Sequence, residues 1–194
     1  MTGTSEEPSD DELLKGYANG DQSAARLLAG RLMPRVHALA WRMLHDRVEA
    51  EDVTQEAMLR LWKIAPDWQE GNAKVSTWLH RVASNLCIDR LRRRRETRSP
   101  DQIPEVADDA PGALERLQTH ERRSALLAAL EKLPERQKLA IMLRHFEDRG
   151  NPEIAEIMGT SVEAVESILA RAKRSLSGRL EHRRDQLGLV GDGR

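Results

Sequence analysis

Apolar residues recur at helical spacing through most of this chain, and that periodicity constrains its fold more than any other feature. The pattern is clear in residues 51–65, read at about 100° per residue. The residues on its apolar face are Val53, Ala57, Leu61 and Ile64. Aromatic residues make up only 3% of the 194 residues, which favours helices packed with aliphatic side chains over a β-sandwich. We therefore expect an all-α protein of two small helical domains joined by a flexible linker.

The opposite face of residues 51–65 combines apolar, charged and amide side chains, a mixture that a solvated helix face does not normally show. An apolar centre surrounded by charged and amide groups is typical of a protein-docking surface. Its members are Asp52, Gln55, Glu56, Leu59, Trp62 and Lys63. An alternative stays open for Trp62, in which this side chain folds back to cover a neighbouring helix.

A second amphipathic helix, expected over residues 75–95, ends in a basic run. Residues 81–98 contain seven arginines and only two acidic residues, although the net charge of the whole chain is −1. The polar side of this helix also carries Trp78, Asn85 and Ile88. Arginines next to an exposed aromatic ring and an amide can bind phosphates and stack on an unpaired base. The alternative is a solvated helix end, where arginines interact favourably with the helix dipole.

Composition divides the chain into two folding units. Residues 99–113 hold three prolines and four acidic residues without a helical stripe, so we expect an extended linker there. The expected divisions are a disordered lead-in (1–9), a first domain (10–98), the linker (99–113), a second domain (114–185) and a tail (186–194).

Capping and turn residues predict where the helices and the loop of the first domain begin and end. We expect Ser9 or Asp10 to cap a short helix, and Asp21 to cap a long one that Pro34 kinks or divides. Trp41 is expected in the core or between helices. Residues 66–74 read as a loop, and its Trp68 is equally consistent with base stacking and with packing onto the helices.

The second domain carries a helix-turn-helix pattern. Asn151 is expected to cap a short helix that Gly159 ends. Thr160 is expected to cap the next helix, with Glu163 completing a capping box. Short helix, glycine turn and longer helix are typical of a DNA-reading motif. The face of the second helix left for DNA comprises Thr160, Ser161, Ser167, Ala170, Arg171 and Arg174.

The two helices of the first domain resemble region 2 of the extracytoplasmic-function (ECF) sigma factors, small members of the sigma-70 family of RNA polymerase factors. The resemblance rests on an ordered string of positions. They are Asp52-x-x-Gln55-Glu56, Trp62-Lys63, Thr77-Trp78-Leu79, Asn85 and Asp89-x-Leu91-Arg92. The helix-turn-helix that follows is similar to region 4 of the same family.

The resemblance implies specific partners. The docking surface would bind the clamp helices of the polymerase β′ subunit, and region 4 would meet the β flap and the minus-35 element. The loop and the second helix would read and open the minus-10 element. The residues expected there are Trp68, Asn72, Lys74, Trp78, Arg81, Asn85, Ile88, Arg92, Arg93 and Arg95. An anti-sigma factor is expected to control such a chain.

The reading helix departs from the common ECF pattern. Glu163, Glu166 and Ile168 stand where many members carry a small residue and then basic ones. The preferred promoter sequence of relatives therefore does not transfer to this chain. The acidic residues also motivate an alternative function, a decoy that binds an anti-sigma protein without starting transcription. A simple helix-turn-helix regulator is a further alternative, but it leaves the docking surface unexplained.

Other function classes find little support. The six histidines and Cys87 show no zinc-type spacing, and no phosphate loop or nucleophile motif occurs in the sequence. We expect no enzyme activity, no metal and no cofactor. No apolar run reaches the length of a membrane span, and residues 6–12 are acidic, so a cytoplasmic protein without membrane insertion is expected.

Overall fold

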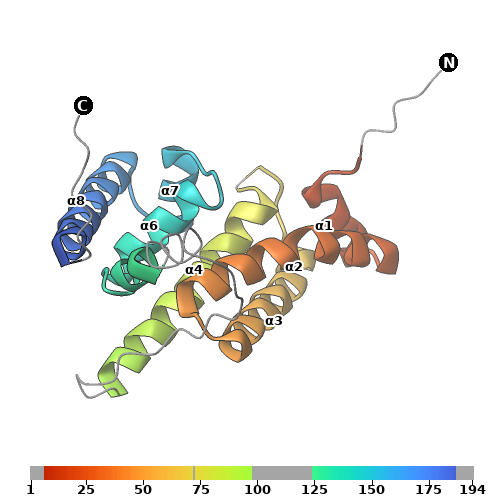
Figure 1. Cartoon of the computed structure of the whole chain (residues 1–194). Coiled ribbons are helices and arrows are strands. Elements are labelled where there is room, and N and C mark those ends of the chain that lie inside the picture. The colour runs from red at the N-terminus through yellow and green to blue at the C-terminus, as the bar shows by residue number, and fades with distance from the viewer. Residues whose placement is uncertain (1–6, 72, 98–123, 187–194) are drawn as a thin grey trace.

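The computed structural model describes residues 7–71, 73–97 and 124–186, and every regular element in these ranges is helical (Figure 1). A helix also covers residues 124–131. The other elements are α1 (Asp10–Ala18), α2 (Gln22–Leu44), α3 (Arg47–Ile64), the short 3-10 helix η1 (Ala65–Asp67), α4 (Val75–Thr97), α6 (Glu135–His145), α7 (Asn151–Met158) and α8 (Val162–Gln186). The expected all-α class is confirmed.

The first unit (residues 7–97) is built around α2, which packs against α1, α3 and α4. The apolar stripe of α2 is fully buried because the helical period places it on one side. Pro34 lies within α2, and the helix continues through it without a break in its helical assignment. The predicted apolar face of α3 is buried in the same core, with Val53, Ala57 and Leu61 all at 0% exposure.

The second unit (residues 124–186) packs α6 and α7 against α8. Leu143, Ile154 and Val165 are fully buried at the centre of this smaller core. Gly159 ends α7 in the left-handed conformation, with φ of 59°, as the sequence predicted. The helix-turn-helix is therefore present, formed by α7 and α8.

Helix caps follow the predictions in the first unit and differ by one residue in the second. Ser9 caps α1 in a capping box with Glu12, and the side chain of Asp21 accepts from the first turn of α2. In the second unit, Gly150 rather than Asn151 is the cap of α7. Ser161, rather than Thr160, caps α8, because its hydroxyl accepts the amide hydrogen of Ala164 at 3.2 Å. The predicted Thr160–Glu163 capping box is wrong.

The predicted burial of Trp41 is wrong. Trp41 is 44% exposed and does not lie in the core. Its ring faces His45, one turn later, with the ring centroids 6.4 Å apart.

Residues 7–9, assigned to the lead-in, are partly held in place because the carbonyl oxygen of Pro8 accepts a hydrogen bond from Arg31 at 2.6 Å. The linker (99–113) and nearly all of the tail (186–194) lie outside the described residues, and the domain boundaries stay predictions.

The two units touch each other directly. α7 and α6 of the second unit pack against α4, and α6 also packs against α2. Figure 1 shows α6 and α7 along one side of α4, with α3 on the other side of the first unit. This arrangement decides which candidate surfaces remain open to partners.

Candidate functional site

The docking surface predicted on α3 is largely exposed, and we call it the α3 surface. Leu59 is 67% exposed, and Asp52, Gln55 and Lys63 are exposed beside it. Glu56 is half-buried, since it forms an ion pair with Arg60 one turn later and lies 3.9 Å from Arg90 of α4. The structure thus presents an apolar side chain within a charged rim, which is the arrangement expected of a docking surface.

Trp62 also contributes to packing inside the first unit. Its ring is half-buried and lies against the ring of Tyr17 in α1, with centroids 4.5 Å apart and planes at 52°. The alternative in which Trp62 covers a neighbouring helix is therefore confirmed. Substitution of Trp62 must affect stability as well as any docking.

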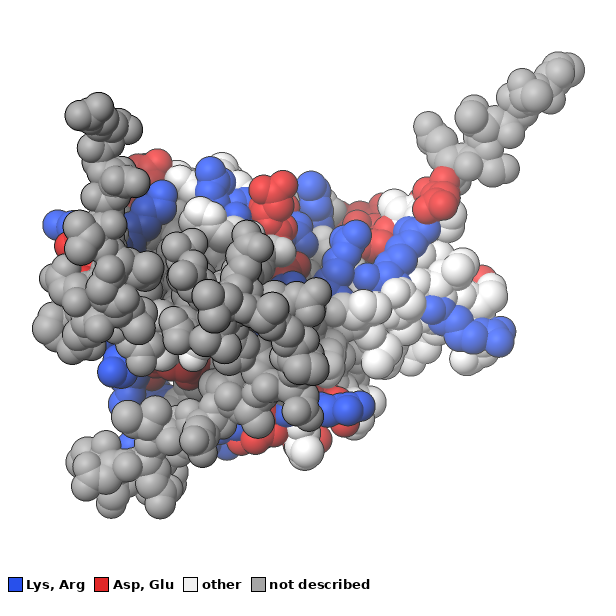
Figure 2. All heavy atoms as spheres, in the orientation of Figure 1, with Lys and Arg blue, Asp and Glu red and all other residues white. Residues whose placement is uncertain are grey.

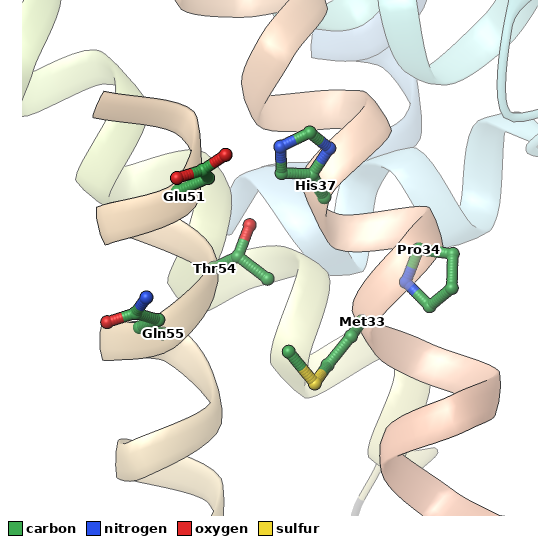
Figure 3. A pocket seen from close by; sticks show the side chains of 6 residues that line it. All are labelled: Met33, Pro34, His37, Glu51, Thr54 and Gln55. Atoms are coloured by element: carbon green, nitrogen blue, oxygen red, sulfur yellow. The ribbon is translucent and has the colours of Figure 1, made fainter. Parts of the chain in front are cut away.

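A groove of about 260 Å³ adjoins the α3 surface, between α2 and α3. Figure 3 shows the side chains of Met33 and His37 on α2 directed toward α3, where Thr54 points back toward them, and Gln55 also lines the groove. Met33 is 39% exposed. The α2 side of this groove was not among the predicted site residues, although Met33 and His37 are four residues apart, the spacing that places two side chains on one helix face.

The basic end of α4 divides into structural and accessible arginines. Arg94 binds back onto the first unit, with its guanidinium 2.7 Å from Glu49 and 2.9 Å from the carbonyl oxygen of Leu44. Arg90 likewise donates to the carbonyl oxygen of Glu49 at 3.1 Å. The α4 residues predicted for minus-10 DNA that the structure leaves exposed are Arg81, Asn85, Arg92, Arg93 and Arg95, whereas Trp78 and Ile88 are half-buried.

The loop before α4 is attached to the first unit by Trp68. Its indole nitrogen donates to Asp11 at 2.8 Å, and its ring meets the ring of Trp78 edge-on, with centroids 6.1 Å apart. Trp68 therefore packs onto the helices, which was one of its two predicted roles. Lys74 is exposed, while Asn72 lies outside the described residues.

The face predicted to read DNA on α8 is open to solvent. Ser161, Ser167, Ala170, Arg171 and Arg174 are exposed, and Thr160 is half-buried. Arg171 is held along its own helix, where it donates to the hydroxyl and the carbonyl oxygen of Ser167 at 3.3 Å. Ile168 is buried, as expected for a core residue, and Glu166 is exposed. Figure 2 shows basic and acidic side chains interspersed over one face of the molecule, so charge by itself does not mark a DNA-binding face in that view.

No metal or redox chemistry is indicated in the described ranges. They contain no group of three or more His, Cys, Asp or Glu residues arranged to hold a metal ion. Burial raises the pKa of the Cys87 thiol to about 12, so the reactive thiolate is scarce at neutral pH. Among the same residues no helix is long and apolar enough to cross a membrane.

Comparison with known families assigns both units. The family described as Sigma-70 region 2 matches residues 28–97, and Sigma-70 region 4 matches residues 123–176. SigM of Mycobacterium tuberculosis, named an ECF RNA polymerase sigma factor, is 32% identical over 173 residues, covering 88% of this chain and 84% of SigM. The chain belongs to the ECF sigma factors. The ECF sigma-E factor of Escherichia coli is 30% identical over 187 residues, with 91% of this chain and 97% of that protein covered.

Some relatives are longer, and some solved structures share the fold at low identity. SigG of M. tuberculosis is 32% identical over 163 residues, or 72% of this chain, but the match spans only 44% of SigG. The structure of CnrH in complex with the cytosolic domain of CnrY aligns with a TM-score of 0.66 at 22% identity, covering 90% of this chain and 99% of CnrH. RpoE of Bartonella quintana, solved with the anti-sigma factor NepR, aligns at 0.61 with 24% identity, over 81% and 96% of the two chains. These structural likenesses establish the shared fold.

Proposed function

We propose that this ECF sigma factor binds core RNA polymerase, directs it to specific promoters and helps to open the minus-10 element. The exposed Leu59 within the charged rim of the α3 surface is the observation that carries this proposal. A helix whose apolar centre is left open after folding needs a partner, and the resemblance to region 2 names the β′ clamp helices as that partner.

The DNA contacts divide between the two units. α4 offers exposed arginines along one side, suited to the phosphates of a melted strand, with Trp78 at its beginning for base stacking. α8 offers Ser167 and Arg171 on an exposed helix face, suited to base edges in the major groove of the minus-35 element. The β flap of the polymerase is the partner proposed for the second unit.

We also propose control by an anti-sigma factor in the cytoplasm. RpoE, which shares this fold, was solved with the anti-sigma factor NepR. The groove between α2 and α3 lies next to the α3 surface, so a protein bound there would compete with polymerase. No catalytic role falls to the chain itself, since sigma factors are initiation factors and bond formation belongs to the polymerase.

Run-off transcription tests the proposal. Purified chain, core polymerase and a genomic promoter library should give discrete transcripts that require both proteins. Initiation on no template would reject the proposal. The decoy function, favoured by the exposed acidic Glu163 and Glu166, instead predicts tight binding to an anti-sigma protein without transcripts.

A further inference from the structure

Two tryptophans, one from each side of the loop before α4, contact each other at its base. Trp68 follows η1, and Trp78 lies at the beginning of α4. Their ring planes meet at 83°, with the centroids 6.1 Å apart. Edge-to-face contact is a favoured geometry for two aromatic rings and restrains the orientation of both. The orientation of Trp78, the ring proposed to stack on a base, therefore depends on Trp68.

Trp68 is held in turn by Asp11 of α1, which lies 57 residues earlier in the chain. The indole nitrogen of Trp68 donates to the Asp11 carboxylate at 2.8 Å, in a partly buried position. Hydrogen bonds to a carboxylate are stronger than those between neutral groups. The backbone N–H of Trp68 donates to the carbonyl oxygen of Ala65 at 3.3 Å, so both N–H groups of this residue have partners.

α1 is a rigid support for this hydrogen bond. Its Leu13 and Leu14 are buried in the core, and the helix packs against η1 and α4. The beginning of the helix is capped by Ser9 together with Glu12. Since these two residues make the capping box, the carboxylate of Asp11 is left to accept the hydrogen bond from Trp68.

Asp11 is close to the proposed minus-10 surface but unsuited to bind DNA phosphates itself. Its side chain lines a hollow of about 380 Å³ together with Lys74 and Thr77. Glu153 and Glu156 of α7 line the same hollow. A carboxylate repels the phosphates of a DNA strand, whereas Lys74 attracts them. The chemistry of Asp11 at this place therefore favours a role through Trp68 over a direct contact with the DNA backbone.

We propose that Asp11 is a positioning residue for minus-10 recognition, which fixes Trp68 and through it orients Trp78 for stacking on an unpaired base. The inference rests on the proposed function, because that function assigns α4 and its preceding loop to minus-10 DNA. A ring that is already held in its stacking orientation loses little freedom when a base binds. α1, to which the sequence analysis gave no role, thereby contributes to promoter opening.

The test measures binding of promoter DNA by the holoenzyme reconstituted from core polymerase and each variant. The promoter is one identified by run-off transcription with the parent chain, prepared both as a full duplex and with its minus-10 element premelted by mismatches. Asp11→Leu should weaken binding to the premelted promoter about tenfold, because stacking on an aromatic ring contributes much of the affinity for an unpaired base. Formation of the closed complex on the duplex at low temperature should not change, since no base is unpaired there.

Two further variants distinguish positioning from a general loss of stability. Asp11→Asn keeps an oxygen that accepts the indole hydrogen bond, so it should recover most of the lost affinity. Trp68→Phe keeps an aromatic ring without the N–H and should lose as much affinity as Asp11→Leu. The double variant with Asp11→Leu and Trp68→Phe should bind no more weakly than either single variant, because both changes remove the same hydrogen bond.

Asp67→Leu is the matched control, since it removes the same charge at an exposed site in η1, next to Trp68. It should bind the premelted promoter like the parent chain. Circular dichroism melting checks that each variant folds, and if Asp11→Leu does not fold, Trp68→Phe and Asp11→Asn carry the test.

Parent-like binding of the premelted promoter by Asp11→Leu or by Trp68→Phe would overturn the inference. Additive losses in the double variant would also overturn it, since they would mean that Asp11 acts independently of Trp68. Failure of the proposed function has a different signature, because the parent chain itself would then give no transcripts with core polymerase.

Discussion

The ammonium nitrogen of Lys138 lies 2.7 Å from the carbonyl oxygen of Met43, which belongs to the other folding unit. Met43 is in the last turn of α2, where carbonyl oxygens lack partners within the helix and attract cations. Burial lowers the pKa of Lys138, and the neighbouring carboxylate of Glu131 opposes this shift. A lysine of the second unit thus donates a hydrogen bond to the C-terminal end of α2 in the first unit, and this bond connects the two units.

Leu59→Ala should weaken binding of the chain to core polymerase by about 1–2 kcal/mol, or roughly 5- to 30-fold, because an exposed apolar centre of an interface typically acts as a hot spot. The free energy of unfolding should not change, since Leu59 is 67% exposed. Val48→Ala is the control, as Val48 is 68% exposed on the same helix but outside the α3 surface. Equal affinities for the two variants would remove Leu59 from the interface.

Trp62→Ala should lower the free energy of unfolding by about 1–3 kcal/mol, because it removes the ring that packs on Tyr17. The measurement is chemical denaturation followed by circular dichroism. Trp62→Phe retains an aromatic ring and should recover most of the loss. If Trp62→Ala unfolds at the denaturant concentration of the parent chain, the contact with α1 contributes nothing to stability.

Acidification should separate the two units. Burial raises the pKa of Glu131, but the hydrogen bond with His45 and the charge of Lys138 outweigh this effect and lower the pKa to about 2, from an ordinary value of 4.5. Lys138 belongs to the same unit as Glu131, so only the hydrogen bond with His45 links this lowered pKa to the contact between the two units. That part of the shift stabilises the contact above pH 4.5 and is lost as the pH falls toward 2. The pKa of Glu147 is also lowered: burial raises it, and His80 and Arg42 outweigh burial.

The radius of gyration should therefore increase between pH 4.5 and 2. Circular dichroism of the same samples distinguishes opening from loss of helix. Glu131→Gln should already be more open at neutral pH and should respond less to acid. A parent chain that keeps its dimensions until its helices melt would contradict this prediction.

Replacing Arg92 and Arg93 with Ala should weaken promoter binding by the holoenzyme for all sequences alike. Each lost phosphate contact should reduce the slope of log K against log salt by about 0.7 on single strands or 0.9 on duplex DNA. Binding isotherms at several salt concentrations, on matched and scrambled promoters, measure both quantities. An altered sequence preference with an unchanged slope would show that α4 reads bases at this end.

Arg171→Ala should instead change which minus-35 sequence is preferred, because contacts with base edges discriminate by roughly 1–3 kcal/mol each. Ser167→Ala is the companion variant, since the Ser167 hydroxyl accepts a hydrogen bond from Arg171 at 3.3 Å. Selection from a library randomised at the minus-35 position gives the preference directly. The same selected sequences for parent and variants would mean that Arg171 binds only phosphates.

Short-range patterns predicted most of the secondary structure, because capping and periodicity depend on residues within a few positions of one another. Asp21 caps α2 and Gly159 ends α7 as expected. The wrong cap predictions also concern neighbouring residues in the sequence. Ser161 and Thr160 both carry a hydroxyl that can cap a helix, and only the backbone conformation of the turn selects Ser161.

The roles of the tryptophans depended on packing that the sequence does not encode locally. Helical period places Trp62 on the polar side of α3, yet α1 returns to that side and offers Tyr17. Trp68 meets Asp11, which lies far from it in the sequence. Trp41 remains exposed although its residue type favours burial.

The sequence by itself determined the helical class, the helix-turn-helix and the open apolar centre at Leu59, because each follows from the order of residues along a single helix or turn. Only the tertiary structure decided which basic residues are free to bind DNA. Arg94 binds Glu49 of its own unit, and Arg95 pairs with Glu135 of the other. The two arginines are adjacent in sequence and both belong to the basic run. Their partners differ because successive residues of a helix point about 100° apart, toward different neighbouring elements.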